Sequence, residues 1–206
     1  CLQVPHTPAH ISIPTDVLRA PRRLRDGKAL MQEDRFIKHH PMPDEEILKE
    51  LTKELARARK VVLFLGDGSG EAIDTIMKFA EYVQTPIVTG PSGKRWVDAY
   101  HPLYRGVFGF GGHETARNAL LDEKVDIILA VGTKLGELST GSWDHNALLN
   151  NKLIHIDASR DNFTRSPMAR MHVYGRISSV FKTLNEHIEM SFDWGRELVA
   201  KSLIND

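Results

Sequence analysis

A continuous apolar run that ends in a glycine-rich turn, Val61–Gly70, constrains the fold of this chain more than any other stretch. Five apolar residues (VVLFL) precede the turn GDGSG, and an amphipathic segment, Glu71–Val83, follows it. An apolar run of this length is typical of a buried strand in a parallel sheet. Glycines let the backbone turn sharply, and a helix that begins there directs N–H groups toward a phosphate. The stretch therefore predicts a strand–loop–helix ligand site at the edge of an α/β sheet.

The same alternation of strand and helix patterns continues along the chain. Acidic residues after Pro43 predict the start of a helix whose apolar stripe extends to Ala58. Further strands are predicted at Pro86–Thr89, Val107–Gly112, Val125–Val131, Leu153–Asp157 and His172–Tyr174, and further helices at His113–Leu121 and Ile177–Ile188. Strands separated by helix-length segments indicate a doubly wound, mainly parallel sheet with helices on both faces. Ligand-binding loops then gather beyond the carboxyl ends of the strands.

Composition excludes several classes of partner. Lys and Arg number 27 and Asp and Glu number 27 in 206 residues, so the formal net charge is zero. This balance argues against a nucleic-acid partner and against a basic membrane contact. Cys1 is the only cysteine, which fits a cytoplasmic protein without an intrachain disulfide. No apolar run approaches the ~20 residues needed to span a bilayer.

The first residues predict that this chain is a piece of a longer protein. It begins with Cys1, and His10–Pro14 has the pattern of a strand with no earlier segment to pair with. Residues 17–43 are rich in Arg, Lys and His, show little periodicity and contain three prolines, which is typical of a linker.

The GDGSG turn has three interpretations that the residues alone leave open. A dinucleotide fingerprint requires G-x-G-x-x-G, but Glu71 occupies the last position, and the next strand ends in Thr89-Gly90 instead of an acid. A standard nicotinamide site is therefore weakly supported. The alternatives are a structural turn without a ligand and a cofactor-contacting loop of a related fold.

Other polar residues follow predicted strands. Asp157 stands where a strand leaves the sheet and is a candidate acceptor for ribose hydroxyls, whereas His155 is interpreted as a core residue with satisfied hydrogen bonds. Glu137 and Asp144 are interpreted as surface charges. The histidines lack metal-ligand spacing and no Gly-x-Ser-x-Gly elbow occurs, so the sequence predicts no catalytic residue and no metal ligand.

A longer pattern joins several of these segments in a fixed order. Its pieces are PIVTGPSGK, HPLYRGVFGFGGHETARNALLDEKVDIILAVGTKLGELSTG, KLIHIDAS and VYGRISSVFKTL. In this order they resemble the central domain of thiamine-diphosphate-dependent enzymes of the acetolactate synthase type, from about Glu46 to Ile188. PAHISIPTDVL is similar to the last strand of the preceding pyrimidine-binding domain in that family.

The resemblance implies a six-stranded, Rossmann-like sheet of the DHS-like NAD/FAD-binding type. Residues 1–16 would end the pyrimidine-binding domain, residues 17–43 would be a linker, residues 44–190 the central domain, and residues 191–206 the start of a C-terminal linker. Thiamine diphosphate and Mg²⁺ would be bound by the flanking pyrimidine- and pyrophosphate-binding domains of the parent. The parent would be a transferase or lyase acting on C–C bonds next to the carbonyl of 2-oxo acids, and a homodimer or homotetramer.

The piece alone would then not be catalytic. Two alternatives of other classes are an autonomous NAD-binding module of the sirtuin type, which would lack its four zinc-binding cysteines here, and a pure oligomerisation domain. The GDG of this chain has no Asn-Asn some two dozen residues later, so it is interpreted as the first loop of the central domain and not as the family's magnesium site.

In flavin-bearing members the resemblance implies contacts with FAD or ADP at the strand ends. The matching positions are Gly66, Gly68, Thr89, Gly90, Gly93, Gly111, Gly112, Gly132, Lys134, Thr140, Gly141 and Asp157. Two departures argue against FAD: the family's Arg-Phe-Asp-Asp-Arg segment is replaced by KLGEL from Lys134 onward, and Arg176 stands where an Asp usually follows a glycine. Lys keeps the charge of Arg but loses its planar fork. An empty site or an adenine nucleotide is expected instead.

Overall fold

The computed structural model describes residues 10–20 and 41–188, and the chain divides into two units, residues 1–40 and 41–206. In the first unit a short helix, α1 (Thr15–Arg19), follows Pro14. The strand predicted at His10–Pro14 is wrong: these residues are irregular, and Ile11 is 78% exposed. A strand needs a partner for its backbone groups, and residues 10–20 form no strand with which His10–Pro14 could pair. Residues 21–40 of the predicted linker and residues 191–206 lie outside the described ranges.

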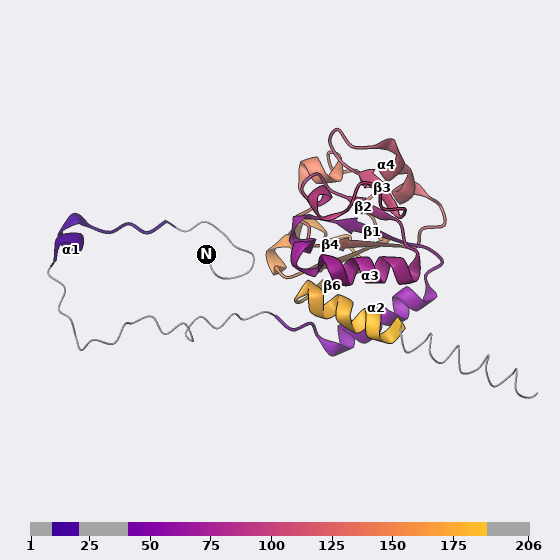
Figure 1. The fold of residues 1–206 in the computed structure, drawn as a ribbon, viewed down its shortest axis with the longest axis horizontal. Helices are drawn as coiled ribbons and strands as arrows, with labels where there is room; N and C mark the ends of the chain where they lie inside the picture. The colour runs from indigo at the N-terminus through magenta and orange to yellow at the C-terminus, as the bar shows by residue number, and fades with distance from the viewer. Residues whose placement is uncertain (1–9, 21–40, 189–206) are drawn as a thin grey trace, which may run out of the picture. The chain divides into compact units, whose positions relative to one another are not determined.

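The second unit is built on a six-stranded, all-parallel sheet (Figure 1). Its strands in spatial order are β3 (Tyr104–Val107), β2 (Ile87–Thr89), β1 (Val61–Leu65), β4 (Ile127–Val131), β5 (Leu153–Asp157) and β6 (Met171–Tyr174). From β1 the chain first builds the β2–β3 half and then returns to the other side of β1 at β4. The switch point therefore lies between β1 and β4, and the predicted doubly wound sheet is confirmed.

The strand predicted at Val107–Gly112 is misplaced, because β3 ends at Val107. Gly109 and Gly111 adopt φ angles of +111° and +65°. Phe108 N–H still donates to Thr89 O at 2.8 Å, and the chain then turns, with Gly112 N–H donating to Gly109 O at 3.0 Å. Two of the glycines that made the segment recognisable are therefore also what end the strand.

The two central strands are paired along their whole length and tied at their amino ends. Val61 to Leu65 of β1 lie opposite Ile127 to Val131 of β4. Ahead of these strands, Arg59 donates its backbone N–H and its side-chain Nε and Nη2 to the Asp126 carboxylate at 2.8–3.1 Å. This bidentate ion pair lowers the pKa of Asp126 to about 2 through hydrogen bonds from Arg59.

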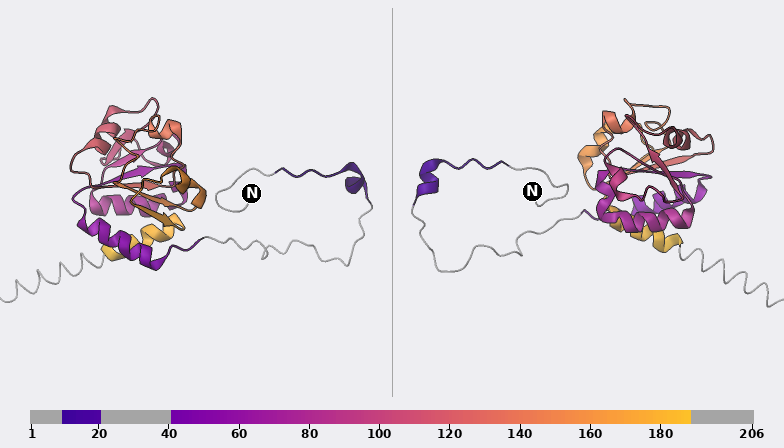
Figure 2. Two further views of the ribbon diagram at one scale, coloured as in Figure 1. Left: turned by 180° about the vertical axis from the view of Figure 1, so that it is seen from behind. Right: turned by 45° about the horizontal axis from the view of Figure 1, so that its top comes forward.

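Three helices cover one face of the sheet (Figures 1 and 2). They are α2 (Glu45–Arg57), α3 (Ile73–Val83) and the helix over residues 177–188. Asp44 caps α2 by accepting the N–H groups of Glu46 and Ile47 at 2.8 and 3.2 Å. The helices bury their apolar stripes against alternate residues of β1, β4 and β5, so this layer forms the larger core cluster.

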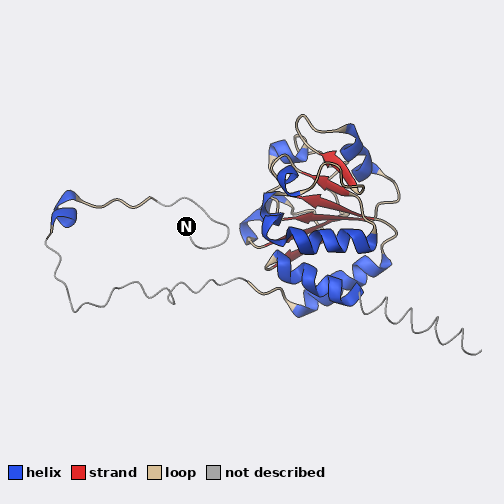
Figure 3. Cartoon of the chain, viewed as in Figure 1, coloured by secondary structure: helices blue, strands red, loops and turns tan. Residues whose placement is uncertain are grey.

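The second face is covered by α4 (Glu114–Leu121) and by the turns of residues 147–149 (Figure 3). Helices on both faces were predicted, and α4 confirms the expectation for this side. The remaining connections carry only short 3₁₀ segments: η2 (Asp67–Ala72), η3 (Gly93–Trp96), η4 (Glu137–Thr140) and η5 (Arg160–Arg165). Among the helices of residues 10–20 and 41–188, none has the length and apolar character that crossing a bilayer requires.

Candidate functional site

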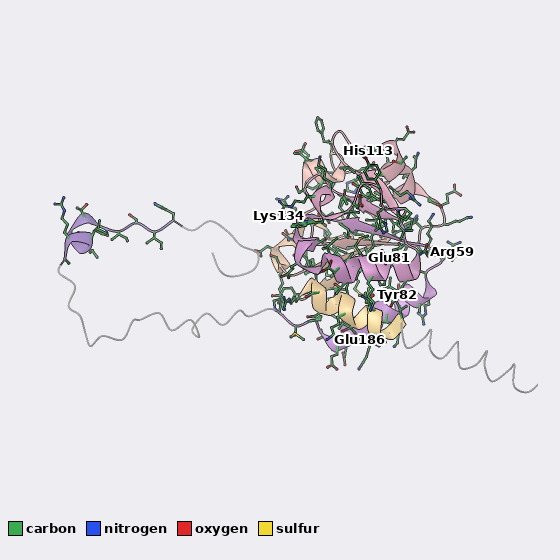
Figure 4. All side chains as sticks on the ribbon, viewed as in Figure 1. Arg59, Glu81, Tyr82, His113, Lys134 and Glu186 are labelled. Carbon is green, nitrogen blue, oxygen red and sulfur yellow. The ribbon has the colours of Figure 1, made fainter. Side chains whose placement is uncertain are left out.

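The carboxyl ends of five neighbouring strands gather the predicted site residues along one edge of the sheet. After β1 come Gly66 and Gly68, and after β3 come Gly111 and Gly112. Strand β2 ends at Thr89 and is followed by Gly90 and Gly93. Strand β4 is followed by Gly132, Lys134, Thr140 and Gly141, and β5 ends at Asp157. Figure 4 shows Lys134 at this edge and Arg59 at the opposite end of the sheet. Parallel strands place all these loops on one side, as the sequence predicted.

The loops after β1 and β4 contact each other backbone to backbone at the switch point. Gly66 N–H donates to Val131 O at 2.9 Å, and Gly68 N–H donates to Gly132 O at 2.8 Å. A Cβ on Gly132 would lie 2.5 Å from the Gly68 carbonyl carbon, and one on Gly66 would overlap Gly132 O. The close approach of the two loops therefore requires glycine at both positions, whether or not a ligand binds there.

The loops after β1 and β2 are joined by side chains that the sequence reasoning did not single out. Arg95 forms an ion pair with Asp67 and stacks over the Trp96 ring at 4.6 Å. Trp96 Nε1–H donates to Asp67 O at 2.9 Å, and a Cβ on Gly70 would lie 2.6 Å from Trp96 Cε2. In the sequence these side chains appear only as an Arg-Trp pair in a loop after a strand. Their partners, Asp67 and Gly70, lie more than twenty residues earlier, so the sequence does not indicate the contact.

The β2 and β3 ends differ in how much backbone they leave accessible. The Thr89 hydroxyl is buried and bonded to the Tyr104 hydroxyl at 2.9 Å, and Gly90 N–H donates to Leu65 O at 2.9 Å. Gly93 packs against that same Leu65 carbonyl. Gly111, in contrast, is exposed with a φ of +65°, and a Cβ there would meet nothing within 4 Å. The rim around β3 is therefore the open part of the edge.

The loop after β4 holds several residues in the left-handed region of backbone space. Leu135, Ser142 and Trp143 have φ angles of +46°, +59° and +65°, although none is glycine. Such conformations cost free energy and concentrate at functional sites. Thr140 stabilises the loop, since its hydroxyl bonds to Gly136 O at 3.0 Å and accepts the N–H of Trp143 at 3.1 Å. Gly141 follows, also left-handed, at +61°.

The end of β5 carries two buried titratable side chains. His155 is fully buried; its Nε2 lies 3.0 Å from Thr133 O and its Nδ1 lies 2.8 Å from Ser166 Oγ. Burial lowers the pKa of His155 to about 4, so the ring is neutral near pH 7. The prediction of a satisfied core histidine is confirmed. Asp157 accepts Ser159 N–H at 2.8 Å, and its burial raises the carboxyl pKa.

The remaining charged candidates are structural or lie at the surface. Asp144 accepts the N–H groups of Asn146 and Ala147 at 2.9 Å, while Glu137 is exposed. Arg176, just after β6, lies 3.9 Å from Glu71. Within residues 10–20 and 41–188, no three His, Cys, Asp or Glu side chains are grouped so as to hold a metal ion.

Comparison with known proteins identifies the family to which this fold belongs. Residues 48–184 match the family described as the central domain of thiamine pyrophosphate enzymes. The chain belongs to this family. An acetolactate synthase large subunit from Cyanidium caldarium is 25% identical over 178 residues, which cover 84% of this chain and 30% of the relative. A relative from Mycobacterium tuberculosis named for the same subunit is 32% identical over 163 residues, 75% of this chain and 28% of its own length.

Two further proteins widen the comparison. A relative from Pseudomonas aeruginosa named for 2-ketoarginine decarboxylase is 29% identical over 156 residues, covering 76% of this chain and 26% of that protein. The crystal structure of a protein from Mycobacterium smegmatis, described as a thiamin diphosphate-dependent enzyme, superposes with a TM-score of 0.55 at 19% identity, over 73% of this chain and 29% of the other. It shows a shared fold. The chain therefore spans about 30% of the length of the relatives it matches.

Proposed function

We propose that this chain is the central domain of an enzyme that makes or breaks a C–C bond next to the carbonyl of a 2-oxo acid. The observation that carries the proposal is the family match over residues 48–184, which coincides with the six-stranded sheet and its helices. The names of the relatives, acetolactate synthase and 2-ketoarginine decarboxylase, support chemistry of this kind. No comparison favours a sirtuin-type module or a pure oligomerisation domain.

The domain acts as a scaffold in this proposal. Thiamine diphosphate supplies the carbanion stabilisation that such bond changes need, and the cofactor and its Mg²⁺ are held by the flanking pyrimidine- and pyrophosphate-binding domains of the parent. The parent is a cytoplasmic homodimer or homotetramer. The test is turnover: the 206-residue chain, supplied with thiamine diphosphate, Mg²⁺ and pyruvate, should release no product above a protein-free control. Measurable turnover would overturn the proposal.

We further propose that the carboxyl edge of the sheet binds an adenine nucleotide, with ADP preferred over FAD. The switch point lies between β1 and β4, and such crevices are the usual ligand sites of open α/β sheets. Lys134 is exposed at this edge and is available to a phosphate, and the open rim at Gly111 leaves room for a ligand. Arg176, beside Glu71, adds a second cation where flavin-bearing members have an acid.

Calorimetry on the purified chain tests this site. ADP should bind more tightly than FAD, and the protein as purified should lack flavin absorbance. Replacing Lys134 by Gln should weaken ADP binding at least about tenfold, because hydrogen bonds to charged groups contribute roughly 1.5–3 kcal/mol. The matched control is Lys182→Gln, since Lys182 is also exposed but lies on the helix over residues 177–188, where it is 4.0 Å from Glu186. Equal losses in both variants, or tighter binding of FAD, would contradict the proposal.

A further inference from the structure

One side chain of β5, His155, holds a residue of the loop after β4, and a second, Asp157, lies beside it. His155 and Asp157 are two residues apart in a strand and therefore point to the same face of the sheet. His155 Nε2 lies 3.0 Å from Thr133 O, and the Asp157 carboxylate accepts the backbone N–H of Ser159 at 2.8 Å. The Thr133 carbonyl is thus held by β5 through His155. His155 Nε2 and Asp157 Oδ2 lie 3.9 Å apart, so the two side chains are neighbours.

The partners of His155 fix its protonation and orientation. A carbonyl oxygen only accepts, so His155 Nε2 carries the proton that is donated to Thr133 O. In the neutral ring Nδ1 is then an acceptor, and it takes the proton of the Ser166 hydroxyl at 2.8 Å. Ser166 is in turn held by His172, whose Nε2 lies 3.0 Å from Ser166 O and 3.1 Å from its Oγ. Phe163 stacks on His172 at 4.7 Å and meets the His155 ring edge-on at 5.0 Å.

Thr133 is itself hydrogen-bonded to Leu135, the non-glycine residue of this loop with a left-handed backbone. Its hydroxyl accepts Leu135 N–H at 3.2 Å, and Leu135 is fully buried while its φ is +46°. Lys134 lies between these two fixed residues and is exposed. A left-handed leucine persists only where its surroundings hold it. The direction in which Lys134 leaves the loop is therefore set by residues on both of its sides.

We propose that His155, with Asp157 beside it, is a positioning residue that holds Thr133 and thereby fixes the loop over residues 132–136, including Lys134, for an anionic ligand. This inference rests on the proposed nucleotide site, but its structural half is independent of any ligand. Ser166 contacts His155 Nδ1, and His172 in turn contacts the Ser166 hydroxyl, so both support the position of the His155 ring. Burying polar side chains is costly unless they are hydrogen-bonded. The hydrogen bonds of His155 and Asp157 explain how two ionisable side chains can be buried at the end of this strand.

Ser166→Ala tests this contact with a small change, since it removes the hydroxyl that orients His155 and that also contacts His172 Nε2 and Phe163 O. Thr85→Val is the matched control: its hydroxyl is equally buried and donates to Val61 O at 2.6 Å, but at the amino end of the sheet. In Ser166→Ala, amide hydrogen exchange in residues 132–136 should accelerate and ADP binding should weaken about two- to tenfold, as expected for the loss of one hydrogen bond. Thr85→Val should leave both unchanged.

A second pair of variants separates the hydrogen bond between His155 and Thr133 O from the packing of the His155 side chain. His155→Gln keeps an N–H donor for Thr133 O, whereas His155→Leu removes it. Amide hydrogen exchange in residues 132–136 should therefore be slower in His155→Gln than in His155→Leu. Unchanged exchange in Ser166→Ala, or equal acceleration in Thr85→Val, would overturn the inference. If the unsubstituted chain bound no ADP, the proposed nucleotide site would fail, while the exchange data would still decide whether β5 holds the loop.

Discussion

The contact between the β1 and β4 loops can be tested with two alanine substitutions at glycines of similar conformation. Gly132 and Gly111 have φ angles of +57° and +65°, so alanine is strained at both. They differ in their surroundings: a Cβ on Gly132 would lie 2.5 Å from the Gly68 carbonyl carbon, while one on Gly111 would meet nothing within 4 Å. The comparison therefore separates the steric cost of the loop contact from the cost of the left-handed backbone.

The expected costs follow from these two terms. A left-handed alanine costs roughly 1–2 kcal/mol, and this applies to both variants. Overpacking against a rigid backbone adds about 1–3 kcal/mol at Gly132 alone. Urea denaturation followed by circular dichroism should therefore show a free energy of unfolding that is lower in Gly132→Ala than in Gly111→Ala by about 1–3 kcal/mol, with unchanged m-values. Equal destabilisation of the two variants would refute the backbone-to-backbone contact.

Three further predictions concern other parts of the unit. Asp44→Ala should lower the free energy of unfolding by about 1 kcal/mol in urea titrations, because α2 loses its N-cap, and Asp44→Asn should restore most of it. Asp126→Asn should lower the melting temperature slightly, with a smaller effect at high salt, because the exposed pair with Arg59 is screened. The folded-state pKa of His155, about 4, lies below the unfolded value of 6.5, so its contribution is complete above pH 6.5 and is lost as the pH falls toward 4. Between pH 7 and pH 5, protonation of His155 in the unfolded state removes about 2 kcal/mol from the free energy of unfolding. An equal loss over this pH range in His155→Gln would contradict the prediction. The raised pKa of Asp157 changes the stability in the opposite direction, and it does so in both proteins.

Much of the fold could be predicted because the central strands are signalled by local patterns. The apolar runs that form β1 and β4 are buried on both faces, so every residue in them is apolar and the strands stand out. β3 was misplaced because its residues are only half-buried, while the glycines after it resemble the end of a strand. The pattern at His10–Pro14 shows that alternating apolar residues do not make a strand without a neighbour to pair with.

The candidate site was predictable in its location but not in its contacts. The topology of a doubly wound sheet places the glycine loops at one edge, and this follows from the order of elements alone. The stacking of Arg95 on Trp96, and the hold of β5 on Thr133, depend on segments that are distant in the sequence. The left-handed Leu135 could not be predicted either, since leucine has no preference for that conformation and adopts it here only through its neighbours.

The glycines at the switch point also specify how the two central strands align. Gly66 and Gly132 extend the alignment of β1 with β4, in which Leu65 lies opposite Val131. A slip of one residue would set Leu65 or Asp67 against Gly132, and the side chain would collide with the backbone that glycine now admits. A one-residue slip also turns every side chain of a strand to the wrong face, so the absence of Cβ atoms at these two glycines favours the observed register over its one-residue alternatives.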